Sequence, residues 1–240
     1  MNYKKMEEMK NKGGTIMAEL DQLLYDKSVD CPVCNKEFTT KKVRMSRLKL
    51  IKRDEDLLSY YEGVNPLIYQ IFVCPYCGYA ASESRFDSIS NKDKKIILDN
   101  ITAKWKKRSY GDIRSDEDAI ITYKLALYVG QLLDYAKIEL GSLTLSIAWL
   151  YRIVGDKEEE NRFLSTTKEL YEFSYYNESL VGSNMDEIRL AYLLGEINRR
   201  IGKKEEALKW FNGVLSNPHI KSNPMIEKLA REQWRLTRDG

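Results

Sequence analysis

The sequence predicts an α+β protein in which a small β module containing four cysteines precedes an α-helical repeat array. The cysteines form two Cys-Pro-x-Cys pairs separated by 39 residues. The segment that leads into the second pair is β-branched and aromatic, which is typical of a strand. From residue 90 onward, apolar residues recur at helical spacing, and a short sequence block repeats after 47 residues.

The composition is that of an ordinary globular protein, with 240 residues, 43% apolar residues and 31% charged residues. No stretch approaches the roughly 18 uninterrupted apolar residues of a membrane span. The charged N-terminus lacks the apolar run of a secretory signal. We therefore expect a cytoplasmic protein that does not enter a membrane, and in the cytoplasm thiols stay reduced.

The two cysteine pairs predict one metal site. Two residues between thiolates let both sulfurs reach one ion, so Cys31 with Cys34 and Cys74 with Cys77 complete a tetrahedral set of four sulfurs. Zinc prefers this coordination in structural sites, so we expect zinc rather than iron. Gly78 suits the turn after the second pair, because glycine adopts positive φ. All four positions are taken by protein, so we expect one structural Zn²⁺ per chain rather than a catalytic ion.

Two other interpretations of the cysteines explain less. Four free buried cysteines would not account for two matched pairs. A redox dithiol is conceivable for one pair, but the βαβ pattern that usually surrounds such a motif is absent.

The chain divides into four predicted segments: a disordered extension over residues 1–17, a zinc-ribbon-like module over 18–90, a basic helical connector over 91–115 and a helical repeat domain over 116–240. Within the module we expect strands over residues 39–53 and 67–73. The codons for residues 12–17 can be back-translated into a ribosome-binding sequence just before an ATG. We therefore hypothesise that translation starts at Met17 rather than Met1.

Serine N-caps predict where the first helices begin. Ser90 with Asp93, and Ser115 with Asp118, each place a side-chain oxygen near the free N–H groups of a first turn. The second cap introduces a helix over residues 119–133, and a further helix is expected over 135–154.

Residues 152–159 resemble residues 199–206, and in each block a glycine follows the apolar end of a helix. Gly155 and Gly202 are expected to take the left-handed C-cap conformation. The second copy resembles a tetratricopeptide repeat, in which small residues let two helices approach and Phe211 fills the seam. The first copy is degenerate, with Glu160 at a small-residue position. Residues 224–235 are expected to form a final capping helix.

Helical repeats leave a curved surface for partners, so we expect a binding or adaptor protein that holds a protein or peptide. The predicted inner face carries seven residues: Trp149, Arg152, Arg189, Tyr192, Glu196, Arg199 and Arg200. The alternative is that the chain's own C-terminal helix fills this groove.

Nucleic-acid binding is the competing prediction. The strand predicted over residues 39–53 is rich in cations, among them Lys42, Arg44, Arg47 and Lys49, and the net charge of residues 91–115 is +5. Proteins usually bind single-stranded nucleic acid by placing cationic side chains against the phosphates and aromatic rings against the bases. The alternative is that these charges protect an exposed edge strand from aggregation.

No catalytic constellation is recognisable. Phosphate loops of the G-x-x-x-x-G-K-[ST] type, G-x-G-x-x-G and G-x-S-x-G sequences are absent, and the one histidine, His219, lies in a predicted turn. We therefore do not predict an enzyme.

Several blocks resemble the bacterial family catalogued as domain of unknown function 2225. They are LYDK at 24–27, CPVC at 31–34, DEDL at 54–57, YY at 60–61, Tyr69, CPYCGYAA at 74–81, Phe86, YGD at 110–112 and RSDE at 114–117. The resemblance covers nearly all of residues 20–220 and implies one cytoplasmic bacterial unit of cysteine module and helices. It implies no activity and no catalytic residues.

Overall fold

The computed structural model describes residues 20–183 and 185–240, which form two compact units. The first unit comprises the described residues up to Lys52 together with Ser59–Tyr135 and Trp149–Asp156. The second comprises Arg53–Leu58, Ala136–Ala148 and Lys157–Gly240. Each unit therefore draws on separate stretches of sequence. The predicted N-terminal extension and the proposed start at Met17 lie outside the described residues.

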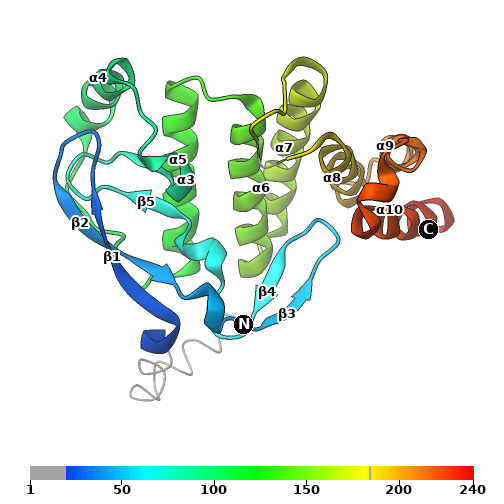
Figure 1. Ribbon diagram of the computed structural model, residues 1–240, viewed down its shortest axis with the longest axis horizontal. Helices are drawn as coiled ribbons and strands as arrows, with labels where there is room; N and C mark the ends of the chain where they lie inside the picture. Colours follow the sequence, from blue (N-terminus) through cyan, green and yellow to red (C-terminus); the bar gives the residue numbers. More distant parts are fainter. Residues whose placement is uncertain (1–19, 184) are drawn as a thin grey trace. The chain divides into compact units, whose positions relative to one another are not determined.

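The α+β class is confirmed (Figure 1). In the first unit, β1 (Leu24–Asp30) pairs antiparallel with β2 (Glu37–Val43), with Leu24 opposite Val43. A second antiparallel pair consists of β5 (Ile71–Val73) and β6 (Ala80–Ser82). A third pair joins β3 (Leu50–Arg53) to β4 (Ser59–Tyr61).

Both long predicted strands are wrong in extent. Residues 39–53 divide into the end of β2, a 3₁₀ turn at Met45–Arg47, and β3. All four residues of β3 are exposed, so the apolar residues that suggested one continuous strand do not form a buried face. Residues 67–73 begin inside a second 3₁₀ turn, Pro66–Tyr69, and only then form β5. There the Asn65 side chain accepts a hydrogen bond from the N–H of Leu67, and Pro66 presets the first φ angle.

The helices of the first unit begin where the serines predicted. α4 (Asn91–Asn100) follows Ser90, whose hydroxyl accepts from the N–H of Asp93. α5 (Asp116–Leu132) begins with a complete capping box between Ser115 and Asp118. The short α3 (Glu83–Phe86) directly follows β6, and α5 packs against β5 and β6.

Buried Arg114 fixes the segment before α5 to the strands. Its guanidinium donates to the carbonyls of Tyr110 (2.6 Å) and Ile71 (2.8 Å) and to the hydroxyl of Thr40 (3.2 Å). Burial lowers its pKa to about 10, so the side chain is still charged at neutral pH. Because the hydrogen bonds satisfy the buried cation, Arg114 is a structural residue of the first unit.

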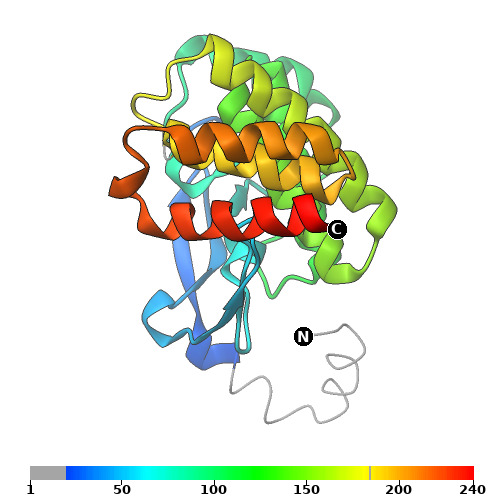
Figure 2. The ribbon, with the colours of Figure 1, turned by 90° about the vertical axis from the view of Figure 1, so that its right-hand side faces the viewer.

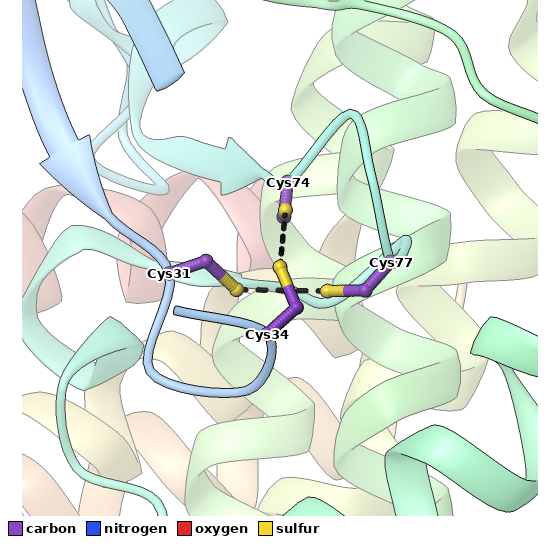
Figure 3. Close-up of side chains that lie close together, drawn as sticks. All are labelled: Cys31, Cys34, Cys74 and Cys77. Carbon is purple, nitrogen blue, oxygen red and sulfur yellow. Dashed lines mark hydrogen bonds between the residues drawn. The ribbon is translucent and has the colours of Figure 1, made fainter. Parts of the chain in front are cut away.

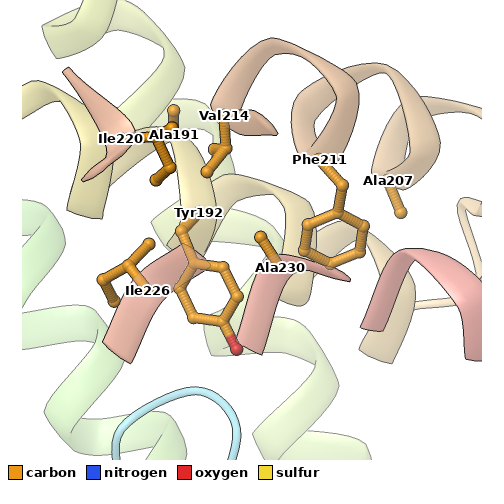
Figure 4. Close-up of a cluster of buried hydrophobic side chains, with 8 residues drawn as sticks. All are labelled: Ala191, Tyr192, Ala207, Phe211, Val214, Ile220, Ile226 and Ala230. Atoms are coloured by element: carbon orange, nitrogen blue, oxygen red, sulfur yellow. The ribbon is translucent and has the colours of Figure 1, made fainter. Parts of the chain in front are cut away.

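The remaining helices are α6 (Lys137–Val154), α7 (Lys157–Asn177), α8 (Glu187–Arg200), α9 (Lys204–Ser216) and α10 (Pro224–Asp239). In the second unit, α9 packs against both α8 and α10, and Figure 2 shows α9 in orange beside α10 in red. The three helices enclose a cluster drawn in Figure 4: Ala191, Tyr192, Ala207, Phe211, Val214, Ile220, Ile226 and Ala230.

The two predicted glycine C-caps are present. Gly155 has φ +88° and Gly202 has φ +80°. After each glycine the next N–H bonds to the carbonyl five residues earlier, Asp156 to Tyr151 (3.0 Å) and Lys203 to Asn198 (2.8 Å). This is the hydrogen-bond pattern of a Schellman motif.

The predicted seam between α8 and α9 is also present, but the two helix pairs are not equal repeats. A Cβ added at Gly195 would lie 2.6 Å from the ring of Phe211. An equivalent approach joins α6 to α7, where a Cβ at Gly141 would lie 2.4 Å from the ring of Tyr171. Glycine and ring are 30 residues apart in the earlier pair and 16 in the later one. A regular tetratricopeptide-like arrangement is therefore not established.

Candidate metal centre

Each cysteine pair lies in the turn of a β-hairpin. Cys31 follows the last residue of β1, and Cys74 follows the last residue of β5. The N–H of Cys31 donates to the carbonyl of Lys36 (3.1 Å), and the N–H of Cys74 donates to that of Tyr79 (2.9 Å). The two turns therefore share one hydrogen-bonding pattern.

A residue with positive φ ends each cysteine turn. Gly78 has φ +76°, as the sequence predicted. The equivalent residue in the first turn is Asn35, with φ +54°, and its N–H donates to the carbonyl of Cys31 (2.8 Å). Asparagine tolerates the left-handed region better than most residues. Sequence reasoning identified the glycine and missed Asn35.

The four sulfur atoms come together in one group (Figure 3). The Sγ atoms of Cys31 and Cys77 are 3.5 Å apart, those of Cys34 and Cys74 are 3.6 Å apart, and all four lie within 4.8 Å of one another. A tetrahedral ion with bonds of about 2.3 Å requires sulfur separations of about 3.8 Å. These distances exceed any disulfide bond, and the four cysteines are free. The group can therefore hold a metal ion.

The electrostatics of the sulfurs also favour a cation. Three of the four side chains are buried, and Cys34 is partly exposed. The contact with Cys31 lowers the pKa of the Cys74 thiol to about 2, while the contact with Cys74 raises the pKa of the Cys31 thiol to about 12. Negative charge on one sulfur thus opposes negative charge on the next, and a bound divalent cation removes this opposition because it stabilises every thiolate.

Residues after α4 cover the second cysteine turn. The indole N–H of Trp105 donates to the carbonyl of Pro75 (3.0 Å), and the hydroxyl of Thr102 donates to that of Cys77 (3.0 Å). The Trp105 ring also lies so close to Gly78 that an added Cβ would be 2.5 Å away. Two side chains outside the β-hairpin therefore hold the turn that positions Cys74 and Cys77.

Two of the four basic residues predicted for nucleic-acid binding have acidic partners. Lys42 forms an ion pair with Glu83, and Lys49 forms one with Glu62 at 3.3 Å. The other two are exposed: the guanidinium of Arg44 lies over the ring of Tyr25, and Arg47 donates to a backbone carbonyl of residue 22.

Residues predicted on the inner repeat face occur in both units. Trp149 and Arg152 belong to the first unit and are half-buried. Arg189, also half-buried, follows Asp186, the N-cap of α8. Tyr192 and Glu196 are fully buried in the second unit.

The second unit's own segments surround Tyr192 and Glu196. Tyr192 clusters with Ile226 and Ala230 of α10, and its hydroxyl donates to the carbonyl of Glu55 (2.6 Å). The carboxylate of Glu196 accepts from Arg199 and Arg200, each at 2.7 Å. A partner would reach these two side chains only after displacing those segments, and their binding role stays a prediction.

Sequence reasoning missed a groove on the second unit. The groove has a volume of about 430 Å³, and its walls come from the C-terminal part of α7 and from α8 and α9. Tyr175, Tyr176 and Trp210 line it, and Tyr176 is 71% exposed. The adjacent tyrosines were a signal, because two large aromatics in succession cannot both face the interior of one helix. The contact of these tyrosines with Trp210 depends on how α9 packs against α7, which the sequence pattern does not predict.

In the described part of the chain, no helix combines the length and apolar content that crossing a bilayer requires.

Comparison with known proteins identifies relatives of unassigned activity. The profile of a family described as "Uncharacterized protein conserved in bacteria (DUF2225)" matches residues 24–237. An uncharacterized protein of Borreliella burgdorferi is 30% identical over 158 residues, which cover 56% of this chain and 54% of that protein. The chain thus spans about half the length of this curated relative. No solved structure matches.

Proposed function

The chain belongs to the bacterial family DUF2225, as its sequence blocks predicted, and we propose that it is a zinc-stabilised binding protein that holds a partner protein or peptide on helices α7, α8 and α9. The family name assigns no activity, so the proposal depends on the chain's own surfaces. The observation that carries it is the aromatic groove of Tyr175, Tyr176 and Trp210.

Zinc in this proposal has a structural role. The four thiolates of Cys31, Cys34, Cys74 and Cys77 fill a tetrahedral shell, which leaves no position for substrate or water. When bound, the ion would supply folding free energy to two hairpins, of which the second, β5 with β6, has strands of only three residues. Two-stranded sheets are marginal alone, so a cross-link between the two cysteine turns would stabilise the first unit.

Exposed aromatic rings favour a binding role for the groove. Tyrosine and tryptophan are enriched at the energetic centres of protein interfaces, because their rings bury much area while losing little conformational entropy. Tyr176 is 71% exposed, and Phe173, one turn earlier in α7, is 50% exposed. Water contact with such rings is unfavourable, and a partner that covers them gains the burial of that surface.

Gly213 provides a variant that tests this proposal without disturbing the core. It lines the groove, and a Cβ added there would meet no atom within 4 Å. Gly213→Phe would fill the groove, whereas the matched control Gly213→Ala leaves it open and improves helix propensity. The test is crosslinked affinity purification from the native bacterium, with and without nuclease.

The proposal predicts a defined partner that survives nuclease, is retained by Gly213→Ala and is lost with Gly213→Phe. Equal recovery by both variants would overturn the assignment to this groove. Loss of the partner on nuclease treatment would favour nucleic acid as the true ligand.

A second candidate function is nucleic-acid binding, and a specific observation favours it. Tyr76, in the second cysteine turn, is 37% exposed, and the ammonium groups of Lys36 and Lys107 lie 5.0 and 5.1 Å from its ring centre. Arg108 lies 5.1 Å from the rings of both Trp105 and Tyr110. Among the described residues, Lys36, Lys107 and Arg108 form no ion pair with a carboxylate. An exposed ring between cations suits a stacked base with its phosphates.

Fluorescence anisotropy with a labelled oligouridylate tests this candidate. Binding should weaken steeply with salt, because it releases counterions. Lys36→Glu with Lys107→Glu should abolish it, while Arg44→Glu with Arg47→Glu tests the strand predicted from sequence. Absence of binding at low salt would eliminate this candidate.

A further inference from the structure

We propose that the groove recognises a cationic side chain, lysine or arginine, in a peptide segment of the partner protein. This inference rests on the proposed function and names the chemistry of the partner. It follows from the three rings and from the carboxylates that line the same groove, Glu187 and Glu206.

The three rings form a contiguous aromatic wall. The ring centres of Tyr175 and Trp210 are 5.0 Å apart with planes at 87°, and those of Tyr175 and Tyr176 are 5.2 Å apart at 85°. Tyr176 and Trp210 are 6.0 Å apart at 43°. Edge-to-face packing turns the ring faces in different directions, and Tyr176, which lines the groove, is 71% exposed, so part of this wall is open to a ligand. The negative face of a tyrosine or tryptophan ring attracts a cation, and tryptophan does so most strongly.

The charges at the groove have the complementary sign. Glu187 and Glu206 are exposed carboxylates, and Lys209 is the one cation among the lining residues. The Tyr175 hydroxyl donates to Glu187 (3.2 Å), which holds this carboxylate beside the ring. Burial, followed by the charge of Glu187, raises the pKa of Tyr175, so the hydroxyl stays protonated at neutral pH.

A second hollow extends the acidic surface and favours a peptide over a small free cation. Its volume is about 540 Å³, and it shares Tyr175 and Glu187 with the first. Glu178 and Asp186 add two carboxylates there, and the lining contains no lysine or arginine. Together the hollows are larger than one side chain requires and extend from the helices over the loop that joins α7 to α8. They suit a segment that places one cation against the rings and further groups beyond it.

The test uses small probes of the two side chains on the full-length protein. The probes are Nα-acetyl-arginine methylamide, Nα-acetyl-lysine methylamide and the neutral Nα-acetyl-norleucine methylamide. NMR reports binding at the indole N–H of Trp210, and Trp105, Trp149 and Trp234 serve as internal controls. We expect a saturable shift of the Trp210 signal with the cationic probes and about tenfold weaker binding of norleucine, since a desolvated cation–π contact and a charge-assisted hydrogen bond together exceed about 1.4 kcal/mol.

Two charge variants separate recognition from folding. Glu187→Gln with Glu206→Gln removes both charges from exposed positions and should weaken the cationic probes about tenfold while leaving norleucine unchanged. Gly213→Arg places a cation in the groove and should block both cationic probes, whereas Gly213→Ala should bind them as wild type does. Indole signals at unchanged positions confirm the fold of each variant.

Three results would overturn the inference: no saturable shift at Trp210, equal binding of norleucine and arginine probes, or saturable binding of spermidine without binding of either amino-acid probe. The last would assign a free polyamine instead of a peptide. A partner that is lost with Gly213→Phe while all probes fail would leave the proposed function intact and remove only the cationic recognition.

Discussion

Arg200 in α8 donates a hydrogen bond of 3.0 Å to the carboxylate of Glu55, which precedes it by 145 residues. The same guanidinium donates to Glu196 (2.7 Å) and forms an ion pair with Asp56 at 3.6 Å. The side chains of Glu196 and Asp56 are completely buried, while Glu55 is partly exposed. Arg200 thus compensates the buried charge of Asp56, shares that of Glu196 with Arg199, and fixes the loop between β3 and β4 to α8 within the second unit.

Replacing Arg200 should strongly destabilise the second unit. Arg200→Met keeps much of the aliphatic packing but leaves buried carboxylates with less compensation, which costs about 3–5 kcal/mol when one partner of a buried pair is removed. The matched control Glu55→Gln keeps an acceptor at a partly exposed position and should cost less than about 1 kcal/mol. Urea unfolding, monitored by tryptophan fluorescence, measures the free energy of unfolding of both variants. Equal stability of the two variants would contradict the role of Arg200 as the compensating charge.

The Arg200 contacts also show where sequence reasoning ends. The acidic run at residues 54–56 was recognisable, but its partner is a cation far along the chain, and no local pattern pairs them. In contrast, Ser115 and Gly202 were assigned correctly, because helix caps depend on residues within one turn. The cysteine cluster was predictable for a different reason, since one ion bound by both pairs would require the two separated pairs to meet.

The misassigned strands have a related cause. The segment Pro66–Tyr69 has strand-like composition, yet Asn65 and Pro66 initiate a 3₁₀ turn whose Leu67 and Tyr69 are buried. An apolar composition indicates that a segment is buried, whereas the turn residues before it determine its backbone conformation. The aromatic groove was missed because it requires α7 and α9 to be adjacent, which is a property of tertiary packing alone.

Removing the metal should unfold the cysteine hairpins while the C-terminal helices stay folded. Structural zinc contributes on the order of 10 kcal/mol of apparent folding free energy. After chelation, hydrogen exchange should show loss of protection in β1, β2, β5 and β6, with α9 and α10 still protected. Elemental analysis of native protein should give one zinc per chain. A metal content near zero, or unchanged protection after chelation, would refute the structural role.

Gly78→Ala should be more damaging than Gly155→Ala, although both glycines have strongly positive φ. An L-residue in the left-handed region lowers the folding stability by about 1–2 kcal/mol. Gly155→Ala should lose only this amount, because no atom lies within 4 Å of its added Cβ. At Gly78 the Cβ would also meet the Trp105 ring at 2.5 Å, which adds about 1–3 kcal/mol of overpacking. Chelator-driven metal release should therefore be faster in Gly78→Ala alone. Equal release rates would show that Trp105 does not support the cysteine turn.

Glu178 should stabilise the second unit in a pH-dependent manner. Its carboxylate accepts hydrogen bonds from the N–H groups of Lys137 (2.7 Å) and Ile138 (3.1 Å), which begin α6. Burial alone would raise the pKa of Glu178, but these backbone donors hold it below its usual value. A carboxyl whose pKa is lowered by folding contributes stability above its unfolded pKa of about 4.3, and this contribution is lost as pH falls through the lower folded value.

The variant that tests this contribution is Glu178→Gln, which keeps an acceptor but loses the charge. At pH 7 it should be less stable than wild type by about 0.5–1 kcal/mol, the lower part of the range for a helix cap, because Glu178 is largely solvated. The difference should shrink as the pH falls below the unfolded pKa of about 4.3, because the unfolded chain then binds a proton that the capped carboxylate resists. Glu169→Gln, at an exposed position of α7, is the matched control and should leave the stability at pH 7 within about 0.5 kcal/mol of wild type. The difference in free energy of unfolding between Glu178→Gln and wild type is measured by urea unfolding at pH 7, 5 and 3.5, monitored by tryptophan fluorescence. A difference that persists unchanged at pH 3.5 would refute the capping role of the charge.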